Sequence, residues 1–171
     1  MAFNKKLIYC FNVSKDIEGF KHDLISECES QRKMNKTGKI INHNFLVVSK
    51  YINKLYNIFY IYSQNILNKF TLKDIDFTLW CFMTDRNYFK TGWHNHKNTA
   101  TINCVIYLET QNQGIDFKEG EETLYLEPHN GDMLIFPNFL DHYPHVSKQD
   151  KRISLNLEMR CNENAKEIFN V

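Results

Sequence analysis

The chain has 171 residues, a length that suits one domain able to bury a core without a metal or disulfide to hold it. Apolar residues make up 43% of the sequence and aromatic residues 14%, which excludes an intrinsically disordered chain. Lysine and arginine total 21 against 20 acidic residues, so the charge balance excludes a general attraction to nucleic acid or to an anionic membrane surface.

The cysteines and the apolar runs bear on where the protein is found. Five cysteines are scattered along the chain without a C-x-x-C pair, which predicts reduced and mostly buried thiols. The N-terminal apolar run is too short and interrupted for a signal peptide, and no window approaches the roughly 18 apolar residues of a membrane span. We therefore expect a soluble, cytoplasmic protein without a membrane partner, and nucleic acid is not an indicated partner. The oligomeric state stays open.

Helical periodicity dominates about residues 1–74. After a candidate cap at Ser14, apolar residues recur at the 3.6-residue period from Ile17 to Cys28. A second helix is predicted to begin at Ser49, with an apolar stripe that extends from Ile52 to Phe70. Both stripes are typical of helices that pack on a core.

The pattern changes to short strands over about residues 75–160. The apolar runs are DFTLWCFM, TATINCVIYLE, GIDF, TLYLEP, GDMLIFP and RISLNLEM, and Gly, Asn and Asp turns separate them. Such runs favour an antiparallel sandwich or small barrel over a parallel sheet. The predicted class is α+β in one domain, residues 1–171, with the N-terminal helices packed on one sheet and residues 161–171 as a C-terminal tail.

Histidines flank two of the predicted strands. His94 and His96 come just before TINCVIYLE, whereas His142 and His145 follow MLIFP. Imidazole is the commonest neutral ligand of transition metals. Arg152, ten residues after His142, can bind a carboxylate in bidentate fashion. A metal and a carboxylate anchor together predict a cosubstrate that chelates at one end and is anionic at the other.

Alternation in RISLNLEMR separates two faces of one strand. Arg152, Ser154 and Asn156 fall on one face, together with Glu158, and the apolar residues fall on the other. An outward-facing edge strand would show the same alternation. On the run TATINCVIYLE, Asn103 and Tyr107 share a face that either lines the barrel or points outward.

At these residues the chain resembles the 2-oxoglutarate- and Fe(II)-dependent oxygenases, which share a double-stranded β-helix (jelly-roll) fold. Their pattern is His-x-Asp/Glu, a distal His, and Arg or Lys about ten residues further on. The sequence is most similar to an uncharacterised subgroup with H-x-H, G-D-L-L-L-F-P-S-W-L-x-H and R-I-S-I-S-F, where this chain has HNH, GDMLIFPNFLDH and RISLNL. The resemblance covers about residues 91–160.

The resemblance implies an Fe(II) site formed by His94, His96 and His142, and a 2-oxoglutarate site formed by Arg152 with Ser154. If its strand face lines the barrel, Asn103 is expected to join the 2-oxoglutarate site. It further implies a dioxygenase that hydroxylates, or oxidatively demethylates, a small molecule or a protein side chain, while 2-oxoglutarate is decarboxylated to succinate. Most of the superfamily carries a carboxylate where this chain has His96, so His96 is either a ligand or a residue that supports the ligands or the substrate.

Two other classes of function stay open at the level of the sequence. One is a cupin-like multi-histidine metalloenzyme, either an isomerase or a dioxygenase without a cosubstrate, and such an enzyme has no need of Arg152. The other is a non-catalytic jelly-roll binding protein, which would bind no metal.

Overall fold

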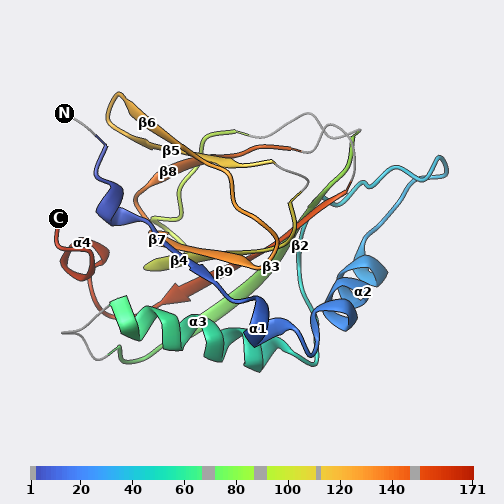
Figure 1. Ribbon diagram of the computed structural model, residues 1–171, viewed down its shortest axis with the longest axis horizontal. Helices are drawn as coiled ribbons and strands as arrows, with labels where there is room; N and C mark the ends of the chain where they lie inside the picture. Colours follow the sequence, from blue (N-terminus) through green and yellow to red (C-terminus); the bar gives the residue numbers. More distant parts are fainter. Residues whose placement is uncertain (1–2, 67–71, 87–91, 111–112, 147–150) are drawn as a thin grey trace.

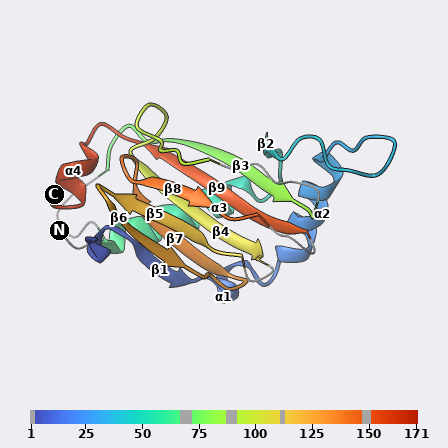
Figure 2. The ribbon, with the colours of Figure 1, turned by 90° about the horizontal axis from the view of Figure 1, so that it is seen from above.

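The computed structural model describes residues 3–66, 72–86, 92–110, 113–146 and 151–171, and within them two antiparallel sheets lie face to face (Figure 1). The larger sheet has the order β1-β7-β4-β9-β3-β2, with strands β1 (Tyr9–Asn12), β2 (Asn44–Leu46), β3 (Asp76–Thr84), β4 (Ile102–Glu109), β7 (Asp132–Pro137) and β9 (Arg152–Arg160). The smaller sheet has the order β6-β5-β8, with strands β5 (Ile115–Glu119), β6 (Glu122–Leu126) and β8 (Asp141–Pro144). Figure 2 looks onto the smaller sheet and shows its strands over those of the larger one.

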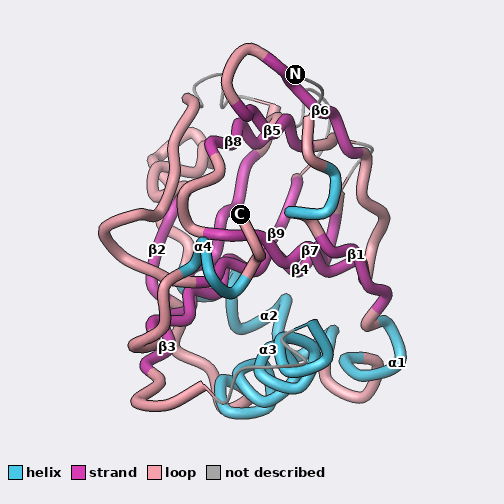
Figure 3. Tube along the Cα trace, turned by 90° about the vertical axis from the view of Figure 1, so that its left-hand side faces the viewer, coloured by secondary structure: helices cyan, strands magenta, loops and turns pink. Residues whose placement is uncertain are grey.

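The helices cover the outer face of the larger sheet. They are α1 (Ser14–Ile17), α2 (Lys21–Gln31) and α3 (Ile52–Ile66), and they lie on the side away from the smaller sheet (Figures 1 and 3). Tyr56 of α3 stacks on Phe77 of β3 with ring centroids 4.7 Å apart, and Phe59 contacts the same ring edge-on at 6.0 Å. The prediction of an α+β chain with N-terminal helices packed on one sheet is confirmed.

The N-terminal region is not purely helical, and this corrects the prediction for residues 1–74. It contributes β1, which pairs with β7, and β2, which pairs with β3, so these two strands form the edges of the larger sheet. Strands of three or four residues are too short to show a two-residue period, and their pairing comes from the neighbouring strand. The same holds for β8, which the sequence did not predict. The predicted helix end at Phe70 lies outside the described residues.

Two further short elements lie among the described residues, one near each end of the chain. A 3-10 helix, η1 (Lys5–Leu7), precedes β1, and α4 (Ala165–Ile168) lies in the predicted C-terminal tail. Asn164 caps α4 by accepting a hydrogen bond from the Lys166 backbone N–H. Ala165 and Ile168 are buried, so part of this tail packs on the protein.

Strand β9 separates the core from the space between the sheets. It pairs with β3 on one side and β4 on the other. Its apolar residues Ile153, Leu155, Leu157 and Met159 are fully buried on the helix side. Its polar residues Arg152, Ser154, Asn156 and Glu158 line a cavity between the sheets. The alternation seen in the sequence therefore divides a face that packs in the core from a face that lines the cavity.

Leu155 offers a test of this core. It is fully buried and pairs in register with Cys81 and Ile106. We expect Leu155→Ala to lower the free energy of unfolding by about 2–5 kcal/mol, because the lost methyl groups leave a cavity. Leu46→Ala, at a side chain that is 56% exposed, should change it by less than about 0.5 kcal/mol. Urea unfolding measures both, and equal effects would contradict this packing.

Two other sequence expectations can be compared with the structure. Cys28, Cys81, Cys104 and Cys161 are buried, Cys10 is exposed, and none of the five is in a disulfide. This agrees with the prediction of reduced, mostly buried thiols. In the part of the chain that the structure describes, no helix has the length and apolar character needed to cross a membrane.

Candidate metal centre

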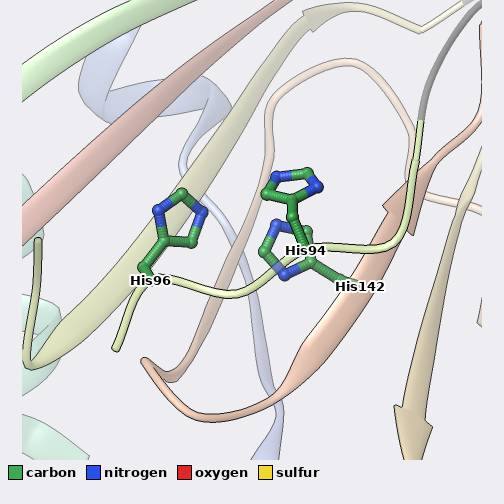
Figure 4. A group of neighbouring side chains, drawn as sticks. All are labelled: His94, His96 and His142. Carbon is green, nitrogen blue, oxygen red and sulfur yellow. The ribbon is translucent and has the colours of Figure 1, made fainter. Parts of the chain in front are cut away.

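The three histidines of the sequence pattern meet at one point (Figure 4). His94 forms an isolated antiparallel bridge with His142 of β8, with N–H···O=C distances of 3.1 and 2.9 Å. The His96 backbone N–H donates to the Asn138 carbonyl at 2.9 Å. These bonds hold the segment before β4 against the start of β8. As a result, one ring nitrogen of each histidine lies within 4.8 Å of the others.

Hydrogen bonds at Nδ1 fix the orientation of each ring. His94 Nδ1 lies 2.9 Å from the Gly92 carbonyl oxygen, and His142 Nδ1 lies 3.2 Å from that of Leu140. His96 Nδ1 lies 2.7 Å from Oε1 of Glu158. Carbonyl and carboxylate oxygens accept hydrogen bonds, so Nδ1 is the donor in each ring and is engaged by the protein. The nitrogen available to an ion is therefore Nε2 in all three rings.

Burial favours the metal-binding form of two of these imidazoles, those of His94 and His142. The pKa of His142 is lowered to about 3, first by burial and then by the neighbouring His94 and His96. Burial also lowers the pKa of His94, against the opposing effect of the Gly92 carbonyl. Neutral imidazole is the ligand form, because a protonated ring has no free lone pair. Three imidazoles with convergent Nε2 atoms fit a divalent transition metal.

Other titratable groups nearby do not join this cluster. Among the described residues, His94, His96 and His142 are the one group of three or more His, Cys, Asp or Glu side chains close enough to share an ion. Asp141 accepts a hydrogen bond from the Asn95 amide at 2.7 Å. His145 Nε2 lies 2.8 Å from Oδ2 of Asp116.

A cavity of about 340 Å³ joins the histidines to the interior of the sandwich. Its walls come from both sheets: Ile115 and Pro144 from the smaller, and Val105 with Tyr107 from the larger. Trp80 of β3 also lines it. The remaining lining side chains are the three histidines and Asn44, Phe82, Asn95, Thr99, Arg152, Ser154, Asn156 and Glu158.

Arg152 places a buried positive charge in this cavity. The side chain is 1% exposed, and Nη1 donates to the backbone carbonyl of His145. Its guanidinium carbon lies 5.8 Å from the ring centroid of Phe82 and 5.5 Å from that of Tyr107. Among the described residues no carboxylate forms an ion pair with Arg152, and its Nε has no hydrogen-bond partner. A buried cation of this kind favours an anionic ligand, because an unpaired buried charge is costly.

Tyr107 of β4 pairs in register with Ser154 of β9, which is two residues along the same strand from Arg152. The buried Tyr107 hydroxyl has no hydrogen-bond partner among the described residues. Burial raises the pKa of Tyr107 to about 12, although the charge of Arg152 acts in the opposite direction. The phenol therefore stays protonated at neutral pH and can donate to an anion. Ser154 is 1% exposed and lines the same cavity.

Asn103 faces the same side of the larger sheet but does not line the cavity. It is opposite Glu158 in the β4–β9 register, is 3% exposed, and has no hydrogen-bond partner for either amide atom among the described residues. Sequence reasoning gave no role to Glu158 or Trp80, although both line the cavity. The alternation of RISLNLEMR placed Glu158 on the correct face, and its contact with His96 depends on the fold.

Neither a family model nor a curated protein matches the sequence. Solved structures with the same fold include a prolyl-4-hydroxylase from Pseudomonas putida, with a TM-score of 0.63, 13% identity, and coverage of 92% of this chain and 94% of that one. A 2OG-Fe(II) oxygenase family oxidoreductase from Burkholderia pseudomallei gives a TM-score of 0.61 at 8% identity, covering 91% and 85%. A non-heme α-ketoglutarate-dependent epimerase from nogalamycin biosynthesis gives 0.64 at 6% identity, covering 90% and 77%.

These similarities confirm the jelly-roll fold and the structural resemblance to 2-oxoglutarate- and Fe(II)-dependent oxygenases. A hydroxylase and an epimerase both occur among the similar structures, so the fold does not determine the reaction. The function must be argued from the site itself.

Proposed function

We propose that this protein is an oxygenase that uses Fe(II) and 2-oxoglutarate, with His94, His96 and His142 as metal ligands and Arg152 as the anchor for the distal carboxylate. One observation carries the proposal: a single cavity contains three convergent imidazoles and a buried arginine that forms no ion pair with any carboxylate of the described residues. A metal-chelating keto acid with a second carboxylate matches both features at once.

Each group in the cavity has a task in this proposal. The Nε2 atoms of the three histidines would hold the ion from one side, which would leave its other side open to the cosubstrate. The Arg152 guanidinium binds the distal carboxylate, and the hydroxyls of Tyr107 and Ser154 donate to the same group. Asn103 is kept as the sequence-based proposal for the cosubstrate site: its buried amide has no hydrogen-bond partner among the described residues, but it is not one of the residues that line the cavity.

When bound, Fe(II) would supply the oxidation of a substrate C–H bond, coupled to the conversion of 2-oxoglutarate into succinate and carbon dioxide. The protein orients the reactants and limits the access of water through the apolar walls formed by Trp80, Phe82 and Val105. Hydroxylation is the expected outcome, and oxidative demethylation follows when the oxidised carbon is an N- or O-methyl group. The substrate is a small molecule or a protein side chain, and we propose that the reaction takes place in the cytoplasm.

Binding measurements separate this proposal from the alternatives. We expect Mn(II) to bind the purified protein, and 2-oxoglutarate to bind the Mn(II)-loaded protein more tightly than the metal-free protein in titration calorimetry under nitrogen. Metal binding without any 2-oxoglutarate binding would instead favour a cupin-like metalloenzyme. Failure to bind either ligand would favour a non-catalytic binding protein.

Mass spectrometry can then identify the substrate. A host lysate is compared before and after incubation with the protein, Fe(II) and 2-oxoglutarate, and the matched control replaces the protein with the His142→Ala variant. We expect a gain of one oxygen, or a loss of CH₂, in a product that forms only with the unmodified protein.

A further inference from the structure

The three candidate ligands are not equivalent, because their Nδ1 atoms face different acceptors. Nδ1 of His94 and of His142 each face a backbone carbonyl two residues earlier in the chain. Nδ1 of His96 faces a carboxylate, that of Glu158 on β9, at 2.7 Å. Among the described residues, therefore, only His96 of these three candidate ligands has a charged group as the hydrogen-bond partner of its Nδ1.

We propose that Glu158 is a positioning residue: its carboxylate, bonded to Nδ1 of His96, orients this ring and makes its Nε2 a stronger electron donor to the metal. The proposal rests on the function proposed above, since it requires His96 to bind a metal. Imidazole ligands bring no negative charge to an ion, so a set of three histidines lacks the charge that a carboxylate ligand would supply. A carboxylate bonded to Nδ1 increases the electron density at Nε2 and fixes the tautomer and the ring angle. Glu158 thus contributes charge without occupying a coordination position.

The fold keeps Glu158 in this place. Residue 158 lies within the central strand β9, opposite Thr78 of β3 and Asn103 of β4. The side chains of His96 and Glu158 are only 20% and 11% exposed, so water weakens their interaction little. A carboxylate on a strand paired along both edges has little freedom to move away from the imidazole.

The same strand also holds the turn that follows His96. Arg160 donates from Nη2 to the carbonyls of Asn98 and Thr99, at 3.2 Å in each case. The backbone N–H groups of Thr99 and Ala100 donate to the carbonyl of His96 at 3.0 Å. Strand β9 therefore supports both the ring of His96, through Glu158, and the backbone after it, through Arg160.

The geometry assigns Glu158 a supporting role and not that of a ligand. Its carboxylate does not belong to the group of atoms within 4.8 Å that the three histidines form. It contacts Nδ1, whereas Nε2 of the same ring is the nitrogen that faces the other two histidines (Figure 4). A direct ligand would have to approach the ion from the Nε2 side.

Glu158→Gln tests this role, because the amide keeps the size of the side chain and an acceptor oxygen but removes the charge. We expect the Co(II) affinity, measured by titration calorimetry under nitrogen, to fall roughly 10–100-fold. The reduction potential of the Fe-loaded protein should rise, because less negative charge near the ion disfavours Fe(III). Glu158→Asp, which keeps the charge at a greater distance, should give an intermediate affinity. Glu127→Gln, at an exposed carboxylate, should leave both quantities unchanged.

The outcomes separate a positioning role from a purely structural ion pair. A structural pair predicts that Glu158→Gln lowers the melting temperature of the metal-free protein while the Co(II) affinity and the reduction potential stay at wild-type values, and this result would overturn the proposal. If Glu158→Gln does not fold, wild-type affinity in Glu158→Asp would overturn it equally. If the wild-type protein binds no Co(II), the proposed function itself is wrong, and Glu158 is then only a structural partner of His96.

Discussion

Replacing Arg152 with alanine is expected to weaken the binding of 2-oxoglutarate to the metal-loaded protein by about 2–5 kcal/mol, or roughly 30-fold to several thousand-fold. The substitution removes a buried cation, the one that lines the cavity among the described residues, and leaves the distal carboxylate without that charged partner. Arg152→Lys should be milder but still harmful, because an ammonium group replaces the bidentate fork. Titration calorimetry of the Mn(II)-loaded variants under nitrogen measures both effects.

The control for this prediction is Arg32→Ala, which removes an equal charge just beyond the end of α2 and outside the cavity. Its affinity for 2-oxoglutarate should match that of the wild type. Thermal unfolding of each variant shows whether the fold is kept. Equal affinity in the wild type and in a folded Arg152→Ala variant would refute the assignment of Arg152.

The second prediction concerns His142, the most buried of the three histidines, with 4% exposure. We expect His142→Ala to nearly abolish metal binding, because it removes a neutral ligand from the centre of the cluster. His94→Ala should have a similar effect. His129→Ala, at a side chain that is 82% exposed, should bind metal as the wild type does. Titration with Co(II) measures these affinities, and wild-type affinity in His142→Ala would contradict the site.

The same titration decides the role of His96. As a ligand, His96 should be nearly as sensitive to alanine as the other two histidines. As a residue that only supports the ligands, it should cost roughly 10–100-fold in affinity. A modest loss in His96→Ala would therefore favour a two-histidine centre, and the role proposed for Glu158 would fail with it.

How much of the fold the sequence predicts depends on strand length. The runs that became β3, β4, β7 and β9 have six to nine residues and show either alternation or a continuous apolar stretch. The strands that sequence reasoning missed, β1, β2 and β8, have three or four residues. Their strand conformation depends on pairing with β7, β3 and β5, and a pattern within so few residues cannot indicate it.

The candidate site shows a similar division. Motif order and spacing singled out His94, His96, His142 and Arg152, and the structure places all four on one cavity. The cross-strand bridge between His94 and His142 joins residues 48 positions apart, so no local pattern predicts it. The contact between Glu158 and His96 likewise depends on two segments that are adjacent only in the folded chain.

The most direct test of the central claim is a crystal of the protein soaked with Fe(II) without oxygen, with anomalous difference density recorded above and below the iron edge. The proposed function predicts one strong peak about 2.1 Å from the Nε2 atoms of His94, His96 and His142. A peak elsewhere, or an ion bound by an acidic side chain such as Asp85 or Asp141 in place of His96, would contradict it.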